Sequence, residues 1–302
     1  MKAIVCSKHG PPDVLRLQEV RKPAPRGDEV LVRVCAATVT RGDVVLRRLH
    51  PLVLVPLRLF GMRRMKIPGV ELAGVIEETG RKVQGFKAGD QVFGTTTGLA
   101  YGANAEYVCL PEKRRLGVLG IKPANMTFEE AAAVPVGGMT ALHILRKANL
   151  QRGQKVLIYG ASGSVGTFAL QLARHFGADV TGVCSSANME LVKSLGAGTV
   201  IDYAKEDFSA RGETYDVIFD AVGKISRSRS KKALKERGVY LTVKSLTKEK
   251  TEYLAFLREL IEAGNLRAAI DRRYPLEQAP EAHRYVETGH KMGNVVITVQ
   301  PG

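Results

Sequence analysis

The chain has 302 residues, of which 45% are hydrophobic and 25% charged, and its formal net charge is +15. This length allows two domains with a sizeable core, and glycine and proline are spread too evenly for a collagen-like or disordered protein. The positive charge favours anionic ligands, but its short clusters contain no interleaved aromatic residues, so nucleic-acid binding is not expected.

The beginning of the chain, MKAIVCSKHG, lacks the apolar segment of a secretory signal. The longest apolar run, 49–60, contains His50 and Arg58 and is too short to span a membrane. The four cysteines are far apart and form no CxxC pair, which is typical of a reducing compartment. We therefore expect a cytoplasmic protein without a membrane span.

Residues 1–122 have the pattern of a β-rich domain, in which short strand-like runs are separated by glycines. Frequent turn signals between short strands are typical of a barrel or a sandwich. The expected strands are 29–34, 74–78, 91–94 and 105–110.

The pattern changes at Asn125, where an alanine-rich helical segment begins, and Thr127 and Glu130 have the spacing of a capping box. Strand and helix patterns then alternate, which indicates parallel βαβ units. The tail, 294–299, is strand-like again, and we expect it to rejoin the first domain. The expected strands of the second domain are 155–159, 180–184, 200–201, 217–219 and 239–243, with helices at 165–176 and 189–195.

The stretch GASGSVG, 160–166, lies between an apolar strand and an amphipathic helix. Its glycines permit a sharp turn and a close approach of the backbone to a ligand. The N–H groups near Gly163, Ser164 and Val165 face outward at a helix N-terminus, where the helix dipole favours an anion such as a pyrophosphate. The order strand, glycine loop, helix and second strand therefore predicts a dinucleotide-binding domain.

A binder of the non-phosphorylated dinucleotide usually has a carboxylate at the end of the second strand. This chain has Cys184, Ser185 and Ser186 there, while Asp179 lies at the wrong end of the strand and Glu190 lies inside the next helix. Small hydroxyl side chains leave room for a 2′-phosphate. We therefore expect NADPH as the cofactor, with NADH as a possible substitute.

Ordered motifs along nearly the whole chain carry a family resemblance, among them IPGVELAGVIEETG, GFKAGDQVFG, GANAEYV, EEAAAVPVGGMTAL, VLIYGASGSVG, LGAGTVIDY, YDVIFDAVG and GNVVIT. The chain resembles the zinc-free quinone oxidoreductases, or zeta-crystallin-like proteins, of the medium-chain dehydrogenase/reductase superfamily. This resemblance implies a GroES-like β-barrel substrate domain, 1–122 with 268–302. It also implies an α/β Rossmann domain, 123–267, with a doubly wound parallel sheet that binds NADP(H).

The resemblance also bears on metals. Zinc-bearing relatives carry Cys at the position of Thr40 and His at the position of Val70, and neither side chain present here is a tight zinc ligand. The close-set four-cysteine zinc loop of such relatives is also missing. We therefore expect no metal site and a hydride transfer to activated alkenes, whose developing anion a few hydrogen-bond donors can stabilise.

The resemblance further implies a role for individual residues. Gly160 to Gly166 would form the pyrophosphate loop, Val222 would border the nicotinamide ribose, and Thr40 and Thr140 would face the nicotinamide and the substrate. Thr40 replaces an asparagine of the family, and no general acid can be assigned. The cofactor-binding residues implied are Gly160, Ser162, Gly163, Ser164, Val165, Gly166, Ser185, Asn188, Tyr203 and Val222.

Several of these assignments have structural alternatives. Relatives often carry Lys at the position of Asn188, which weakens the expected grip on a 2′-phosphate. The hydroxyl of Thr140 could bond its own helical turn, and Tyr203 could be an ordinary aromatic at a strand end. Asp43, in the sequence RGD, is better explained as a local turn or ion-pair residue than as a catalyst.

The segment after residue 243 is shorter than in the family, so we expect five Rossmann strands instead of six. The missing edge often forms the dimer interface of relatives, so the chain is expected to be a homodimer or a monomer. The expected function is NADPH-dependent reduction of small-molecule quinones or α,β-unsaturated carbonyl compounds. Alternatives are an NADPH-binding structural or regulatory protein, with RNA bound through the basic clusters, and a zinc alcohol dehydrogenase.

Overall fold

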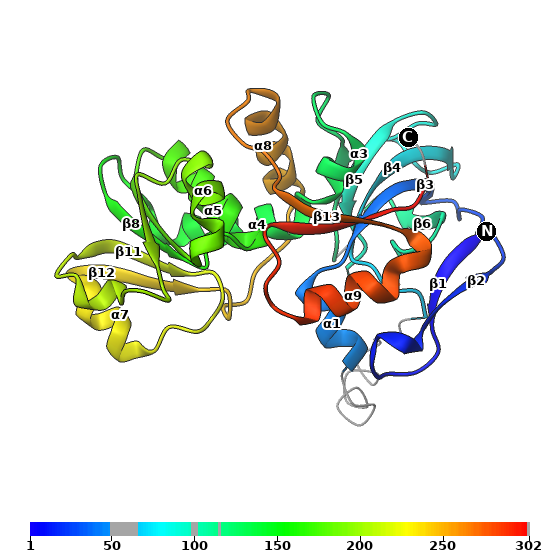
Figure 1. Ribbon diagram of the computed structural model, residues 1–302. Helices are drawn as coiled ribbons and strands as arrows, with labels where there is room; N and C mark the ends of the chain where they lie inside the picture. Colours follow the sequence, from blue (N-terminus) through cyan, green and yellow to red (C-terminus); the bar gives the residue numbers. More distant parts are fainter. Residues whose placement is uncertain (49–65, 98–101, 114–115, 301–302) are drawn as a thin grey trace. The chain divides into compact units, whose positions relative to one another are not determined.

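The computed structural model describes residues 1–48, 66–97, 102–113 and 116–300. Figure 1 shows the course of the chain through its helices and strands. The apolar run 49–60 lies outside the described residues.

The chain divides into two compact units. The first consists of residues 1–135, 250–258 and 270–302, and the second of residues 136–249 and 259–269. Helix α8 (Thr251–Glu262) begins in the first unit and ends in the second. The domain limits expected from the sequence remain a prediction, because packing units need not coincide with folding domains.

The first unit is built on a largely antiparallel sheet with the strand order β13-β14-β3-β4-β5-β7, to which β6 adds by pairing with β3. Its central strand is β3 (Glu29–Thr38), an apolar run that is buried along most of its length. The other strands are β4 (Glu71–Thr79), β5 (Gln91–Thr95), β6 (Tyr107–Pro111), β7 (Leu119–Ile121), β13 (Ile270–Pro275) and β14 (Asn294–Thr298). The four strands expected in this part of the sequence are confirmed.

The C-terminal strand returns to the first unit, as the tail pattern predicted. β14 pairs antiparallel with β3, so that Val296 lies opposite Thr38. A separate hairpin of β1 (Lys2–Cys6) and β2 (Leu15–Glu19) was not expected from the sequence, because four of the five β2 side chains are exposed and give no core signal.

Among the described residues, three short α-helices lie in the first unit: α1 (Arg41–Arg48), α3 (Phe128–Ala132) and α9 (Ala279–Glu287). The predicted capping box is confirmed at α3, where the Thr127 hydroxyl accepts a hydrogen bond from the Glu130 N–H and the Glu130 carboxylate accepts one from the Thr127 N–H. This reciprocal pair satisfies two donors at the helix start. Helix α3 packs on β3 and β4, and α1 packs on α9.

The second unit contains a parallel sheet with the strand order β10-β9-β8-β11-β12. The five strands confirm the number expected from the sequence. Their bounds are β8 (Lys155–Tyr159), β9 (Asp179–Cys184), β10 (Thr199–Asp202), β11 (Tyr215–Asp220) and β12 (Leu234–Thr242).

Helices cover both faces of this parallel sheet. Side chains of one face, including Leu157, Val183 and Ile218, pack with Phe208 of the short helix η3 (Phe208–Ala210) and with α7 (Arg227–Ala233). The opposite face meets α5 (Ser164–His175) and α6 (Met189–Ser194), and helix α4 (Pro135–Ala148) precedes the sheet in sequence. This is the doubly wound arrangement that alternating strand and helix patterns predicted.

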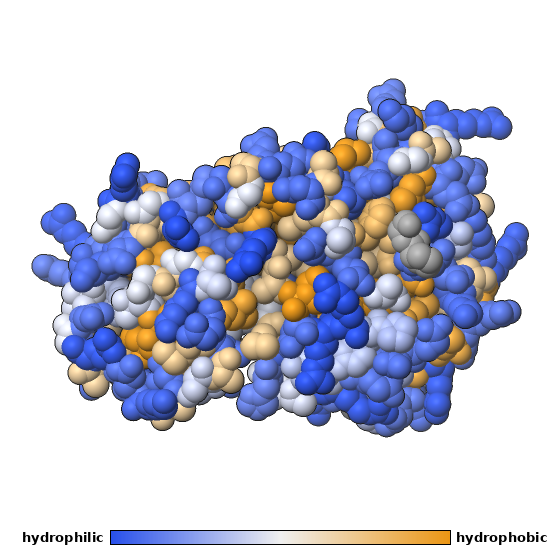
Figure 2. All heavy atoms as spheres, turned by 45° about the horizontal axis from the view of Figure 1, so that its top comes forward, coloured by the Kyte–Doolittle hydropathy of each residue, from blue (hydrophilic) through white to orange (hydrophobic). Residues whose placement is uncertain are grey.

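Hydrophilic side chains cover most of the molecular face in Figure 2, and the hydrophobic ones gather in smaller groups between them. In the part of the chain that the structure describes, no helix has the length and apolar character needed to cross a membrane.

A buried histidine lies between two helices of the first unit. His283 of α9 is fully buried, and neither ring nitrogen has a hydrogen-bond partner among the described residues. The equally buried Arg47 of α1 donates to the Gly10 carbonyl and to the Glu287 carboxylate. Desolvation, together with the Arg47 charge, lowers the pKa of His283 to about 3. The ring therefore stays neutral in the folded state at mildly acidic pH.

We expect His283 to make the protein sensitive to acid. The unfolded state binds a proton at the ordinary pKa of about 6.5, while the folded state does not until pH falls to about 3. Stability is therefore lost as pH falls from about 6.5, by at most roughly 1.4 kcal/mol per pH unit. Urea unfolding of the wild type and of His283→Leu between pH 7 and 4.5 should show this extra slope in the wild type only. The exposed control His290→Gln should follow the wild type, and parallel curves for wild type and His283→Leu would contradict the prediction.

Candidate functional site

The glycine loop joins strand β8 to helix α5 in the second unit. Gly160 has φ +78°, and a Cβ atom placed on it would lie 2.1 Å from Cγ2 of Val222. The N–H of Gly163 donates to the Gly160 carbonyl at 3.1 Å and closes the turn. Any other residue at position 160 would therefore suffer both backbone strain and a steric clash.

Two further close approaches fix the start of α5. A Cβ on Gly166 would lie 2.1 Å from the Gly160 carbonyl oxygen, so the first turn of the helix packs directly on the loop. A Cβ on Gly137 of α4 would lie 2.6 Å from the hydroxyl oxygen of Ser164. The absence of these side chains lets α4, the loop and α5 come together.

The N-terminus of α5 has the properties of an anion site. Its N-cap is Gly163, no side chain caps it, and its first turn contains no acidic residue. The first turn of a helix leaves N–H groups without intrahelical acceptors, and the helix dipole adds partial positive charge there. Ser164, Val165 and Gly166 begin this turn, so their backbone can meet a phosphate group.

The segment after β9 is tied to the glycine loop and to the end of β10. The Asn188 side-chain amide donates to the Ser162 hydroxyl at 2.9 Å. The Tyr203 N–H donates to the Cys184 carbonyl at 3.0 Å, which brings Tyr203 beside Ser185. Half of the Tyr203 side chain is exposed. The structure thus gathers Ser162, Ser185, Asn188 and Tyr203 at the carboxyl edge of the sheet.

The end of β11 completes this edge. The Ala221 N–H donates to the Tyr159 carbonyl at 3.0 Å, and the carboxylate of the fully buried Asp220 accepts from the N–H groups of Val222 and Gly223. This turn holds Val222 against Gly160. In open parallel sheets, ligands bind beyond the carboxyl ends of the strands, so the cofactor-binding residues expected in this unit lie at the appropriate edge.

A carboxylate that sequence reasoning missed lies at the same edge. Asp202 ends β10 and pairs in register with Cys184, and only 3% of it is exposed. One oxygen accepts from the Ser186 hydroxyl, and the other accepts from the Ala204 N–H at 3.0 Å. The Ser186 hydrogen bond is the main cause of its lowered pKa. The signal for it in the sequence was the aspartate of VIDY, which lies on β10, whereas a cofactor carboxylate is expected at the end of β9.

Thr140 lies on α4, one turn after Gly137, and is half-buried. Within the described ranges its hydroxyl makes no hydrogen bond, so the alternative of a bond to its own helical turn is not seen. Because Gly137 contacts Ser164, the i+3 position places Thr140 on the same side of α4.

Thr40 lies in the first unit, at the start of α1, where it caps the helix. Its hydroxyl donates to the Asp43 carboxylate at 2.6 Å and accepts from the Asp43 N–H at 3.1 Å, and its own N–H donates to the same carboxylate at 2.8 Å. Burial raises the pKa of Asp43, and the bonds from Thr40 oppose this shift. Asp43 is therefore a local structural residue, as its position in RGD suggested.

Val70 occupies the second position at which zinc-bearing relatives carry a metal ligand. Its side chain is 8% exposed, and its carbonyl accepts a hydrogen bond from the Thr96 N–H at 2.7 Å. The neighbouring Glu71 is 1% exposed and accepts a hydrogen bond from Thr38, so it joins the ends of β3 and β4. In the described part of the chain, no group of three or more His, Cys, Asp or Glu side chains is arranged to hold a metal ion.

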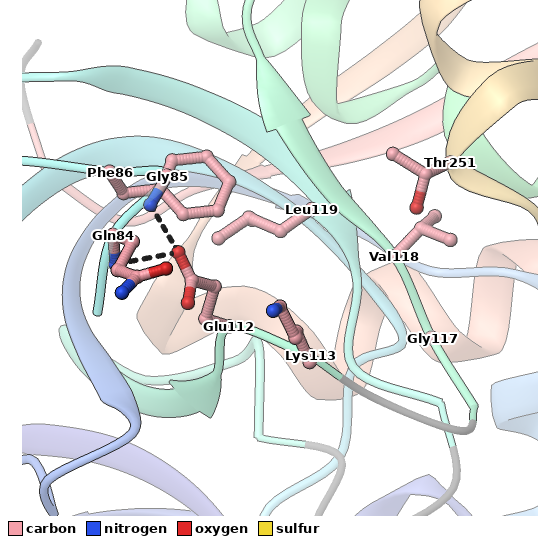
Figure 3. A pocket seen from close by; sticks show the side chains of 9 residues that line it. All are labelled: Gln84, Gly85, Phe86, Glu112, Lys113, Gly117, Val118, Leu119 and Thr251. Carbon is pink, nitrogen blue, oxygen red and sulfur yellow. Dashed lines mark hydrogen bonds between the residues drawn. The ribbon is translucent and has the colours of Figure 1, made fainter. Parts of the chain in front are cut away.

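A hollow of about 570 Å³ lies elsewhere in the first unit (Figure 3). Phe86, Val118 and Leu119 form its apolar wall, and the Glu112 carboxylate accepts from the N–H groups of Gln84 and Gly85. The hollow contains none of the residues that the sequence assigned to the site.

Comparisons with known proteins agree with this geometry. Residues 26–136 match the alcohol dehydrogenase GroES-like domain, and 195–251 and 241–297 match the zinc-binding dehydrogenase model. The 2-methylene-furan-3-one reductase of Solanum lycopersicum is 35% identical over 98% of this chain and 79% of its own length. The chain belongs to the zinc-free quinone oxidoreductase-like family of the medium-chain dehydrogenase/reductase superfamily.

Other members of this family are similar along the whole chain. The chloroplastic NADPH-dependent alkenal/one oxidoreductase of Arabidopsis thaliana is 31% identical over 98% of this chain and 79% of its own length. The structure of the quinone oxidoreductase from Coxiella burnetii matches with a TM-score of 0.88 and 30% identity, and covers 99% of both chains. Membership confirms the combination of a GroES-like part and a Rossmann part.

The contact between Gly160 and Val222 can be tested by a double-mutant cycle. Gly160→Ala should lower the free energy of unfolding by roughly 2 kcal/mol or more, because it adds left-handed strain to a clash. Val222→Ala alone removes a side chain that is 45% exposed and should cost less. The double variant should recover about 0.5 kcal/mol or more relative to additivity, measured by urea unfolding. Strict additivity would show that the two residues do not meet.

The capping role of Thr40 predicts a stability effect. Thr40→Val should lower the free energy of unfolding by about 1 kcal/mol, because the helix loses its cap and Asp43 loses a donor. Thr40→Ser keeps the hydroxyl and should restore most of the loss. Urea unfolding measures both variants. If Thr40→Val is as stable as the wild type, the hydroxyl does not act as a cap.

Proposed function

We propose that this chain is an NADPH-dependent reductase that transfers hydride to quinones or α,β-unsaturated carbonyl compounds. The observation that carries the proposal is the uncapped N-terminus of α5, placed by Gly160 and Gly166 at the carboxyl edge of a parallel sheet. Relatives named as alkenal/one and quinone oxidoreductases support the same reaction class.

The residues present fit a dinucleotide. The close approaches at Gly160 and Gly166 leave a backbone cradle, and nothing beyond the Gly160 carbonyl comes within 4 Å of a Cβ placed on Gly163. Ser162, Gly163, Ser164 and Val165 would hold the pyrophosphate. Val222 would border the nicotinamide ribose, with Ser185, Asn188 and Tyr203 near the adenosine end.

When bound, NADPH supplies a hydride to the electrophilic β-carbon or to the quinone ring. The reaction leaves negative charge on the substrate oxygen as an enolate or hydroquinone anion, which hydrogen-bond donors can stabilise and water can protonate. Thr140 offers a hydroxyl without a partner among the described residues, and Thr40 offers one that α1 already uses. Position 70 is a valine, so this chain lacks the imidazole that could bind a Lewis-acid metal there.

NADPH is the favoured coenzyme, and NADH is a possible substitute. The hydroxyl of Ser185 and the absence of a free carboxylate at the end of β9 support this choice. The substrate is a small molecule, and the protein acts as a homodimer or a monomer. None of the four cysteines, all of which lie in the described residues, forms a disulfide, which fits the reducing cytoplasm that we propose as the compartment.

The proposal predicts turnover without a metal. The purified protein, treated with a chelator, should consume NADPH with 9,10-phenanthrenequinone or an alkenal and should not reduce the matching saturated aldehyde. The reason is that only the conjugated substrate spreads the developing charge without a Lewis acid. Absorbance at 340 nm measures the reaction. NADPH binding without turnover of either substrate would contradict it, and so would about one zinc per chain in elemental analysis.

A further inference from the structure

The side chain at position 188, in the segment that follows β9, has a structural task. Asn188 uses its side-chain amide to hold Ser162 of the glycine loop at 2.9 Å. An uncharged amide also supplies little attraction for a phosphate. If the second unit binds a phosphorylated dinucleotide, the positive charge must come from another residue near Ser185.

The turn after β10 brings such a residue to this place. The Tyr203 N–H bonds the Cys184 carbonyl, so the turn runs beside Ser185. Lys205 follows two residues later, and its N–H donates to the Asp202 carbonyl at 3.1 Å. Its side chain is 75% exposed, and among the described residues it forms one ion pair, a long one of 3.9 Å, to the Asp202 carboxylate.

Asp202 is held mainly by hydrogen bonds from other groups of the protein. Both of its oxygens accept hydrogen bonds from the protein, and it is almost completely buried. Its oxygens are thus already engaged by the protein, unlike the free carboxylates that select the non-phosphorylated cofactor. Lys205, in contrast, has ammonium hydrogens left for an anion, on a four-carbon stem long enough to reach across the turn.

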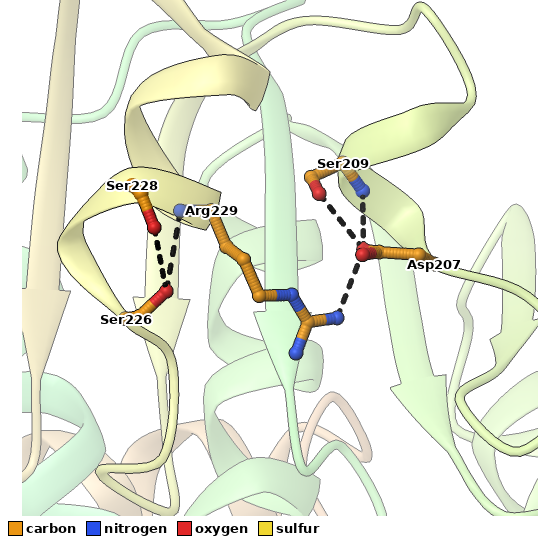
Figure 4. A network of polar contacts seen from close by, with 5 residues as sticks. All are labelled: Asp207, Ser209, Ser226, Ser228 and Arg229. Carbon is orange, nitrogen blue, oxygen red and sulfur yellow. Dashed lines mark hydrogen bonds and ion pairs between the residues drawn. The ribbon is translucent and has the colours of Figure 1, made fainter.

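Hydrogen bonds hold the turn after β10 in place at both of its ends, Asp202 and Asp207. Asp202 holds one end through Ser186. At the other end Asp207 accepts from the Ser209 N–H and from Arg229 of α7 at 2.9 Å, as Figure 4 shows. The Arg229 guanidinium also lies over the Phe208 ring, 5.0 Å from its centroid. The hydrogen bond from Arg229 lowers the pKa of Asp207 to about 2, so the anchor stays charged at neutral pH.

We infer that Lys205 selects coenzymes that carry a phosphate on the adenosine 2′-oxygen, together with Ser185 and Tyr203. Lys205 takes over the electrostatic role left open by Asn188. This inference rests on the proposed function, since it concerns the adenosine end of the same dinucleotide. The recognised group is a phosphate monoester on a ribose, held by one ammonium group and one or more hydroxyls.

Calorimetric titration with 2′,5′-ADP and with 5′-AMP tests the inference without any turnover. Lys205→Gln should weaken 2′,5′-ADP binding roughly tenfold, the effect of about 1.4 kcal/mol, and leave 5′-AMP binding within about twofold. Lys205→Arg should keep most of the affinity. The matched control is Lys193→Gln on α6, an exposed lysine that pairs with Glu190 at 3.0 Å, and it should change neither ligand.

Steady-state kinetics adds a second readout. Lys205→Gln should raise the KM for NADPH roughly tenfold, with kcat and the KM for NADH unchanged, because the phosphate is remote from the transferred hydride. The inference is overturned if 2′,5′-ADP binds the variant as tightly as the wild type, or if 5′-AMP is weakened equally. It is also overturned if wild-type protein does not prefer 2′,5′-ADP over 5′-AMP.

Different results would overturn the proposed function and the role of Lys205. Wild-type protein that binds neither nucleotide would overturn the proposed function and the role of Lys205 together. Selective 2′,5′-ADP binding that Lys205→Gln abolishes, in a protein that reduces no quinone or enone, would overturn only the reductase.

Discussion

The candidate site depends on one steric constraint, the space left by the missing side chain of Gly160. Val222 fills that space, and the Gly160 carbonyl is approached by Gly166 from the other direction. Because β8 and β11 are neighbours, these contacts draw the loops that follow both strands together at one edge of the sheet. The N-terminus of α5 begins at the same edge, and no side chain caps it by a hydrogen bond. A β-carbon at Gly166 would push the first turn of α5 away from the loop, whereas one at Gly160 would displace Val222.

The parallel sheet was predictable because its inner strands β8, β9 and β11 are largely buried and have the sequence pattern of apolar runs. Strand β8 was expected with its observed bounds, and helix α5 within one residue at each end. Strand β12 begins five residues earlier than expected. Its register shifts between Leu234 and Val239, where it pairs with β11, and as the outermost strand it has no second neighbour to fix its alignment. Local charge at 235–237 therefore concealed the strand.

The site itself was only half predictable. The glycine loop could be read from spacing because each glycine meets a local steric demand. The position of Asp202 at the site could not be predicted in this way, because strand order is a property of the folded sheet. In the sequence this residue lies 18 positions after Cys184. The pairing of Asp202 with Cys184 makes these distant residues neighbours. Thr40 is a residue whose local role could have been predicted. The spacing of Thr40 and Asp43 alone indicates a cap at the start of α1, but Thr40 was assigned a role taken from relatives.

The same reasoning explains why a substitution at position 188 need not abolish recognition of a phosphate. A bound phosphate is stabilised by a positive charge close to it in space. The residue that carries this charge can therefore come from any segment of the chain that lies near the phosphate. Two segments meet beside Ser185, one following β9 and the other following β10. In this chain the first segment carries the amide that secures the glycine loop, and the second carries the cation, Lys205, on a turn held by Asp202 and Asp207. If Lys205 has the role that we propose, loop support and charge lie on two different segments, and coenzyme preference would change at Lys205 without disturbing the glycine loop.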